Sequence, residues 1–248
     1  MGVTQRVRAE TGSAWRSFAR RRTAVFFTFF FPVIIILIFG ALVRTQPTGG
    51  GLFARQPAYY VPGYLAVVVL FTPLSRVGST VARHREGNRF EKLATTPLSR
   101  LEWLLAHTLV NVVIIGIASL IILALVIVVT GADIALSPLL VPFIACAVAL
   151  FCGFGALLGS IADSQDGVIA ASNAIALPLL FLSETFVPPS LLPTWFRPAL
   201  DLSPLTYFAR GVRAATTGGN GALSNLLVLV VLMFVFFAAG AYAIPQTD

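Results

Sequence analysis

The stretch TAVFFTFFFPVIIILIFGALV, residues 23–43, decides the class of this protein. Its 21 residues carry no charge and lie between Arg22 and Arg44. As an α-helix they would extend about 31 Å, the thickness of a bilayer's hydrocarbon core. Burying one charge at that depth costs about 2.5–3.5 kcal/mol, so uncharged windows predict where the chain crosses a membrane.

The composition of the whole chain agrees with that stretch. Of 248 residues, 57% are hydrophobic and 11% are charged, whereas soluble proteins average about 25% charged residues. The mean hydropathy is +0.89. A single soluble core could not enclose this much apolar surface. The composition therefore excludes a cytosolic enzyme, a secreted disulfide scaffold and a disordered chain.

Five further uncharged windows predict the remaining spans. They are residues 56–75, 103–132, 134–162, 167–183 and 222–243. The window 167–183 gives the weakest signal, because it has only 17 residues and contains Asn173 and Pro178. The sequence therefore predicts an all-α integral membrane protein with six transmembrane helices, formed by residues 1–248 as a single domain.

The basic residues predict the orientation in the membrane. Six precede the first window: Arg6, Arg8, Arg16, Arg20, Arg21 and Arg22. Six more separate the second and third windows: Arg76, Arg83, Arg85, Arg89, Lys92 and Arg100. The opposite side would hold Arg44, Arg55, Arg197, Arg210 and Arg213. This excess puts both termini in the cytoplasm, and it accounts for the net charge of +7 without nucleic acid. We expect the membrane to be a prokaryotic cell membrane.

Residues 1–22 are predicted to form a cytoplasmic amphipathic segment. Val7, Ala14 and Phe18 share one helical stripe, so the helix would lie in the interface with its arginines toward anionic lipid. A frayed basic tail is one alternative. A cleaved signal peptide is another, but its apolar core is typically about 7–15 residues long, shorter than the window found here.

The most charged stretch is VARHREGNRFEKLATTPLSRLE, residues 81–102, within the predicted cytoplasmic segment 76–102. It has two interpretations, a solvated loop or an elbow that docks on another protein. Ser99 and Glu102 have the spacing of a capping box, which predicts that the third helix begins there.

Residues 184–221 are too apolar for an ordinary loop and too rich in proline for a span. We expect short helices that re-enter the outer leaflet, one of them beginning at Ser203-Pro204. In the fourth window Gly155 and Gly159 form a pair of small residues that lets helices approach closely, either within one chain or between two copies.

Several kinds of chemistry have no motif in this sequence. No G-x-x-x-x-G-K-[ST] phosphate loop occurs, so we expect no ATP hydrolysis on this chain. His84 and His107 lack the spacing of a metal site, and we find no nucleophile–base pair for a membrane-embedded enzyme. No predicted span carries an acid or base near its centre, as proton-coupled carriers usually do. We therefore expect no catalytic, cofactor or metal site here, and an energy source outside the membrane.

Two motifs resemble those of the type-2 ATP-binding-cassette (ABC) transporter permeases. The first is REGNRFEKLATTPLSR, residues 85–100, which is similar to the family's cytoplasmic segment after span two. The second is PLLFLSETFVPPSLLPTWF, residues 178–196, followed by SPLTY at 203–207, which is similar to the end of span five and the outer re-entrant helices. The predicted topology agrees with the family over nearly the full length.

The resemblance implies a non-enzymatic permease subunit of an exporter. Its substrate would be an amphipathic drug, lipid or polysaccharide-like molecule moved out of the cytoplasm. A separate cytoplasmic ABC ATPase subunit would bind ATP and Mg²⁺, and a second permease copy or a similar subunit would complete the pathway. The alternative is an ATP-independent secondary carrier or channel.

The resemblance also implies roles for particular residues. The elbow would couple to the ATPase through Arg85, Glu86, Arg89, Phe90, Glu91, Lys92 and Leu93. In this arrangement Glu86 and Glu91 would pair with basic groups on the ATPase, and Phe90 and Leu93 would be apolar anchors.

At the outer mouth the candidates are Glu184, Pro188, Trp195 and Tyr207. Glu184 departs from the family's pattern, which more often has a small residue after Leu-Ser. Its carboxylate would either disfavour anions along the route or simply reach water.

Overall fold

The computed structural model describes residues 2–38 and 56–245, and in these ranges the chain is helical with no strand. The α-helices are α1 (Val3–Ala19), α2 (Arg22–Ile36), α3 (Val61–Glu86), α4 (Arg89–Ala94), α5 (Arg100–Thr130), α6 (Leu140–Ile161), α7 (Gln165–Phe181), α8 (Arg197–Leu200), α9 (Pro204–Thr217) and α10 (Ala222–Ala243). Two 3-10 helices are η2 (Pro57–Tyr60) and η3 (Pro189–Leu191).

Among the described residues, four helices are long and apolar enough to cross a membrane, judged by length and composition. They are η2 with α3, α5, α6 and α10. The helices α2 and α7 are apolar but shorter. Residues 39–43, the last part of the first predicted span, lie outside the described residues.

Several predicted boundaries agree with the structure. The helix α10 has the predicted bounds, and α5 begins at the predicted capping box, in which Ser99 Oγ accepts from the Glu102 amide at 3.2 Å and Glu102 Oε2 accepts from the Ser99 amide at 2.9 Å.

The helix that contains the second predicted span continues beyond the uncharged window, from Val61 to Glu86. Past Arg76 its polar face borders a cavity.

The helix α6 lies at the centre of the bundle and packs on both α3 and α10. A Cβ atom added to Gly155 would overlap the carbonyl oxygen of Leu74, and one added to Gly159 would overlap that of Gly78. These two glycines therefore pack α6 against α3 inside one chain, which decides between the two alternatives that the sequence left open.

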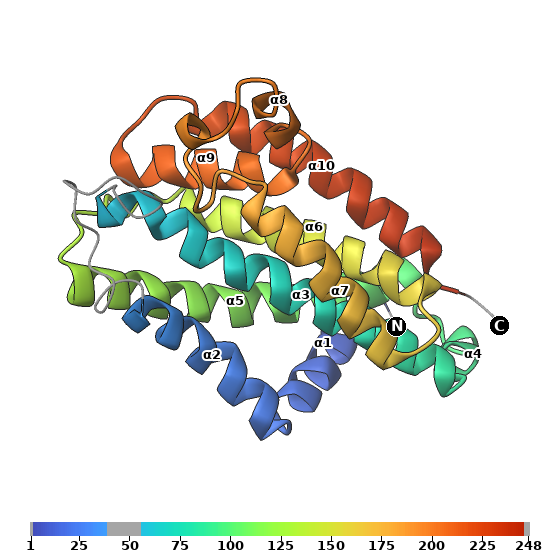
Figure 1. Ribbon diagram of the computed structural model, residues 1–248. Coiled ribbons are helices and arrows are strands. Elements are labelled where there is room, and N and C mark those ends of the chain that lie inside the picture. Colours follow the sequence, from blue (N-terminus) through green and yellow to red (C-terminus); the bar gives the residue numbers. More distant parts are fainter. Residues whose placement is uncertain (1, 39–55, 246–248) are drawn as a thin grey trace.

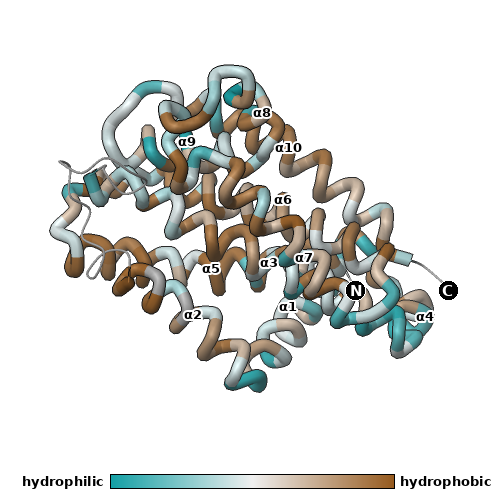
Figure 2. The backbone as a smooth tube through the Cα atoms, viewed as in Figure 1, coloured by the Kyte–Doolittle hydropathy of each residue, from teal (hydrophilic) through white to brown (hydrophobic). Residues whose placement is uncertain are grey.

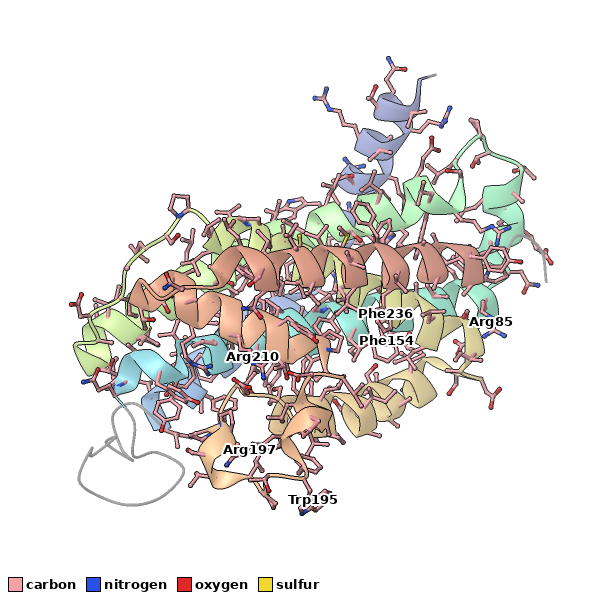
Figure 3. All side chains as sticks on the ribbon, turned by 90° about the horizontal axis from the view of Figure 1, so that it is seen from above. Arg85, Phe154, Trp195, Arg197, Arg210 and Phe236 are labelled. Carbon is pink, nitrogen blue, oxygen red and sulfur yellow. The ribbon has the colours of Figure 1, made fainter. Side chains whose placement is uncertain are left out.

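A second face of α6 contacts α10. Gly153 lies directly against the α10 backbone at Gly240, so that neither position has room for a side chain. Beside this contact the rings of Phe154 and Phe236 lie 5.3 Å apart between centroids (Figure 3).

The bundle has two distinct ends (Figure 1). We call them the α4 end, where α3 ends, α5 begins and both labelled termini lie, and the α9 end, which carries η2, α8 and α9. Hydrophilic residues gather at the α4 end, whereas apolar residues cover the helices between the ends (Figure 2). Outward-facing side chains such as Leu120 and Val128 are exposed there, as expected for contact with lipid.

The amphipathic helix α1 packs on α5. Its Ala14 and Phe18 side chains are buried, while Trp15 is 41% exposed. Near its start, Arg6 forms an ion pair with Glu102 of the capping box. The apolar stripe predicted for this segment therefore faces another helix of the same chain.

Candidate functional site

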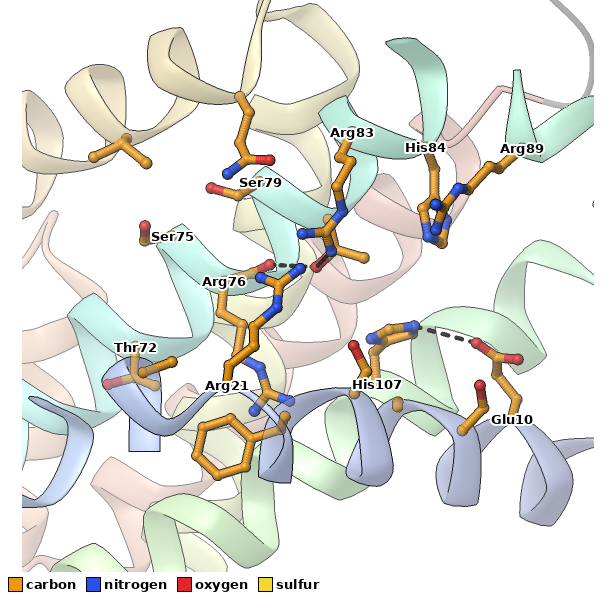
Figure 4. A pocket seen from close by; sticks show the side chains of 18 of the residues that line it. Glu10, Arg21, Thr72, Ser75, Arg76, Ser79, Arg83, His84, Arg89 and His107 are labelled. Atoms are coloured by element: carbon orange, nitrogen blue, oxygen red, sulfur yellow. Dashed lines mark hydrogen bonds and ion pairs between the residues drawn. The ribbon is translucent and has the colours of Figure 1, made fainter. Parts of the chain in front are cut away.

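A cavity of about 1090 Å³ lies between α1, α2, α3 and α7 (Figure 4). Its titratable lining residues are Glu10, Arg21, Arg76, Arg83, His84, Arg89, Lys92 and His107. Because Arg89, Lys92 and Leu93 belong to α4, the predicted elbow forms part of the cavity wall. The cavity therefore brings together residues of α1 and of α4, which are distant in the sequence.

One face of α3 forms much of this wall. The lining residues on it are Thr72, Ser75, Arg76, Ser79, Thr80 and Arg83. Their spacing of three to four residues puts them on a single side of the helix, whereas Gly78 packs on α6. From the sequence, Arg76 and Arg83 were expected in the cytoplasmic segment after the second span, and this polar face was not predicted. The repeat of polar residues every three to four positions could have indicated it.

The cavity side chains make few strong contacts. The guanidinium of Arg76 lies 4.4 Å from the centroid of the Phe18 ring, a cation–π distance, and donates to Asn111 Oδ1 at 3.3 Å. Arg83 donates to the Thr80 hydroxyl at 3.4 Å. These partners are an aromatic ring, an amide and a hydroxyl, none of which carries a negative charge.

Glu10 is the carboxylate in the cavity wall, and it faces a histidine. Its Oε1 atom lies 3.4 Å from Nε2 of His107 (Figure 4). The contact with the His107 ring lowers the pKa of Glu10 from its ordinary value. Glu10 therefore links α1 to α5 beside the cavity.

The elbow turns sharply before α4. Asn88, with φ of +49°, adopts the left-handed conformation that asparagine tolerates better than most residues. After this turn, Phe90 is buried, and its ring lies 5.4 Å from the His84 ring and 5.6 Å from the Trp103 ring. The predicted apolar anchor Phe90 is thus held inside its own chain, and Leu93 is half-buried.

Two further elbow residues hold α3 to its neighbours. Arg85 donates to the carbonyls of Ser160 at 2.7 Å and Ala162 at 3.1 Å, at the end of α6 (Figure 3). This position is favourable for a cation, because the last carbonyls of a helix are unpaired and partly negative. Glu86 Oε1 accepts from the Gln165 amide, the first residue of α7, at 2.9 Å.

The exposed part of the elbow is the other half of the predicted set. Arg89, Glu91 and Lys92 are all exposed at the α4 end. Glu86 is exposed as well, so it both contacts α7 and presents charge to the outside, whereas Phe90 is buried.

At the α9 end, Glu184 does not reach water, because it is 7% exposed and paired. It accepts from Arg210 Nε at 2.8 Å and also pairs with Arg213. The guanidinium of Arg213 lies 4.1 Å from the Tyr59 ring centroid. Burial lowers the pKa of Arg213, whereas the hydrogen bond to Glu184 raises that of Arg210.

The other outer-mouth candidates lie apart from one another. Pro188 is buried, Trp195 is 78% exposed, and the Tyr207 hydroxyl donates to the Asp201 carbonyl at 2.8 Å. Figure 3 places Trp195 and Arg197 on the outside of this region and Arg210 on its inner side. Tyr207 is thus connected to the Glu184 cluster through Asp201, which also pairs with Arg210.

A sequence profile of the ABC-2 type transporter matches residues 5–217, which include the cavity, the elbow and the Glu184 cluster. The chain belongs to the ABC-2 type transporter family. As an ABC-2 permease with several long apolar helices, it is a multi-pass membrane protein.

A relative matches this ABC-2 permease over a shorter stretch. The daunorubicin resistance ABC transporter permease protein DrrB1 of Streptomyces coeruleorubidus is 34% identical over 76 residues. The match covers 31% of this chain and 27% of the relative, so about a quarter of the relative's length is spanned.

Proposed function

We propose that this chain is the membrane subunit of an ATP-driven exporter of the prokaryotic cell membrane. The observation that carries the proposal is the family match over residues 5–217, which includes both the elbow and the cavity beside it. A cytoplasmic ABC ATPase binds ATP and Mg²⁺ and contacts the exposed charges of α4. The cargo enters through the cavity and leaves the cytoplasm.

In the proposed topology the chain crosses the membrane six times, through α2, α3, α5, α6, α7 and α10. Arginines concentrated at the α4 end support a cytoplasmic location of that end and of both termini. On this basis residues 1–22 are the cytoplasmic amphipathic segment, 76–102 include the coupling elbow, and 184–221 form the outer re-entrant region. The chain 1–248 acts as one permease domain, and a second copy or a similar permease completes the pathway.

Coupling requires that a motion of the ATPase reach the cavity. Arg89 and Lys92 line the cavity and are also exposed on α4, so a displacement of α4 changes the cavity wall directly. The anchors Phe90 and Arg85 transmit the same displacement to α5 and α6. ATP-dependent closure then shifts the population between inward-open and outward-open states.

Charge reversal on α4 tests this function. The variant Arg89→Glu with Glu91→Lys keeps the net charge and the buried anchors but exchanges the exposed charges. We expect at least a tenfold loss of ATP-driven export in proteoliposomes and of co-purified ATPase, with unchanged membrane insertion. The control is Asp163→Lys, an exposed charge change at the same end outside α4. Unchanged export in the α4 variant contradicts the proposal.

The alternative is an ATP-independent carrier or channel. Transport by the purified chain in liposomes, without ATPase subunit or nucleotide, would favour it.

A further inference from the structure

The charges that line the cavity are unbalanced. Five cations contribute to the wall: Arg21, Arg76, Arg83, Arg89 and Lys92. Glu10 is the carboxylate beside them, and its Oε1 atom lies 3.4 Å from Nε2 of His107, so the five cations outnumber it. Within residues 2–38 and 56–245, no carboxylate forms an ion pair with any of the five.

Three of the described carboxylates have other partners. Glu102 pairs with Arg6, Glu184 pairs with Arg210, and Glu86 accepts from the Gln165 amide. A surface loop could leave its arginines to water, but Arg76 and Arg83 are half-buried in a helical wall. Cations in such a place are stabilised by a bound anion.

Neutral donors in the same wall also lack partners. Ser79 Oγ and His84 Nδ1 are buried without a hydrogen-bond partner, and both residues line the cavity. Figure 4 shows the side chains of Arg21 and Arg83 reaching into the same space from opposite walls. Several guanidinium forks around one space suit an anion with many oxygens, such as a phosphate group.

Apolar side chains also contribute to the wall, beside hydroxyl and amide residues. Phe27 of α2, Phe71 of α3 and Ile169 of α7 line the same cavity, and Phe27 and Ile169 expose much of their side chains. A volume of about 1090 Å³ exceeds what a phosphate ion needs and lies at the upper end of small-molecule sites. The cavity therefore has room for an apolar tail beside a charged head group.

We infer that the cavity binds an anionic amphiphile, with a phosphate-type head group on the arginines and its tail along Phe27, Phe71 and Ile169. This rests on the proposed function and gives it a substrate class, because the bound amphiphile is the cargo of the exporter. A cationic amphiphile is disfavoured by the same arginines.

The test is a binding series with the full chain in phosphatidylcholine nanodiscs. The probes are dodecyl phosphate, dodecylphosphocholine and dodecyltrimethylammonium, which share one tail and differ in head-group charge. We expect dodecyl phosphate to bind at least tenfold more tightly than the other two by titration calorimetry, and its affinity to fall as salt rises. Equal affinities, or a preference for the cation, overturn the inference.

Substitutions locate the binding site. Arg21→Gln with Arg83→Gln should weaken dodecyl phosphate binding at least tenfold. The matched control is Arg20→Gln with Arg22→Gln, which removes the same charge from exposed residues outside the cavity and should leave the affinity within twofold. Arg21→Lys with Arg83→Lys keeps the charge and should restore part of the affinity, which guards against a misfolded glutamine variant. An equal loss in the control variant overturns the inference.

Two further arms separate the possible sources of the anion. If inorganic phosphate at millimolar concentration displaces dodecyl phosphate, the head group alone suffices; if phosphatidylglycerol in the nanodisc displaces it, a membrane lipid fills the same site. Both results support an anionic site, whereas displacement by neither, together with equal probe affinities, overturns it. None of these measurements needs the ATPase. Loss of the head-group preference with ATP-driven export intact contradicts only this inference. A preserved head-group preference in a chain that co-purifies with no ATPase and exports nothing with ATP contradicts only the proposed function.

Discussion

The arginines at the two ends of this bundle differ in their partners. At the α9 end, Arg210 and Arg213 surround the buried carboxylate of Glu184. In the cavity near the α4 end, Arg21 and Arg83 face one another without a carboxylate. A paired arginine stabilises the fold, whereas an unpaired arginine in a cavity is available to a ligand. On the inference drawn above, the comparison separates arginines that hold the fold from arginines that hold a ligand.

The largest effect should come from breaking the paired end. Glu184→Gln leaves two arginines without their carboxylate, and we expect a loss of about 3 kcal/mol in the free energy of unfolding, since removing one partner of a buried pair is costly. The measurement is denaturant titration of the purified protein in detergent. The control is Asp201→Asn, which removes the half-exposed carboxylate on Arg210 and should cost less than about 1 kcal/mol. Equal losses would show that burial does not distinguish the two carboxylates.

A smaller effect should follow at an arginine of α3 that is paired with carbonyl oxygens. Arg85→Gln loses the bonds to Ser160 and Ala162, which should cost about 2 kcal/mol because these bonds involve a charged donor. Arg89→Gln removes the same charge from an exposed position and should stay within about 0.5 kcal/mol of the parent. Thermal unfolding followed by circular dichroism compares the two. A larger loss for Arg89→Gln would contradict the assignment of Arg85 as the anchor.

Acid should weaken the attachment of α1 beside the cavity. The pKa of Glu10 lies below its ordinary value of 4.5, so its contribution is complete above that value and is lost as the pH falls through the lowered pKa. We expect a loss of about 1 kcal/mol, seen as a change in Trp15 fluorescence when α1 loosens. Glu10→Gln should abolish this pH dependence. A transition that persists in the variant assigns it to another group.

The smallest effect on stability should come from the unpaired end. Arg21→Gln with Arg83→Gln removes two like charges and no carboxylate pair, so the free energy of unfolding should change by less than about 0.5 kcal/mol. Denaturant titration of this variant beside Glu184→Gln completes the comparison. A loss near that of Glu184→Gln would mean that the cavity arginines support the fold.

The sequence predicted local features better than contacts between distant segments. The capping box at Ser99 and the bounds of α10 follow from neighbouring residues, and both agree with the structure. The continuation of α3 to Glu86 was not predicted, because the uncharged window ends at Ser75 and does not show how far the helix extends beside the cavity. The sequence alone does not reveal that cavity, since its wall combines residues as distant as Glu10 and Asn173.

The Glu184 cluster illustrates the same limit. Twenty-six positions separate Glu184 from Arg210. Only the return of α9 beside the end of α7 brings them together, and no spacing rule for a single helix covers that distance. The charge of Glu184 was visible in the sequence, but the identity of its partner depended on the fold.

The glycine contacts between α3 and α6 restrict how a transport cycle can proceed. The backbones of α3 and α6 are in contact at Gly155 and Gly159, so a rotation of one helix against the other would produce a steric clash. We therefore expect the two helices to move as one rigid unit. In the proposed transport cycle, alternation between inward and outward access would then involve the other cavity walls, α1 with α2 on one side and α7 on the other. A cross-link between α3 and α6 should therefore leave transport unchanged, whereas a cross-link between α2 and α7 should stop it.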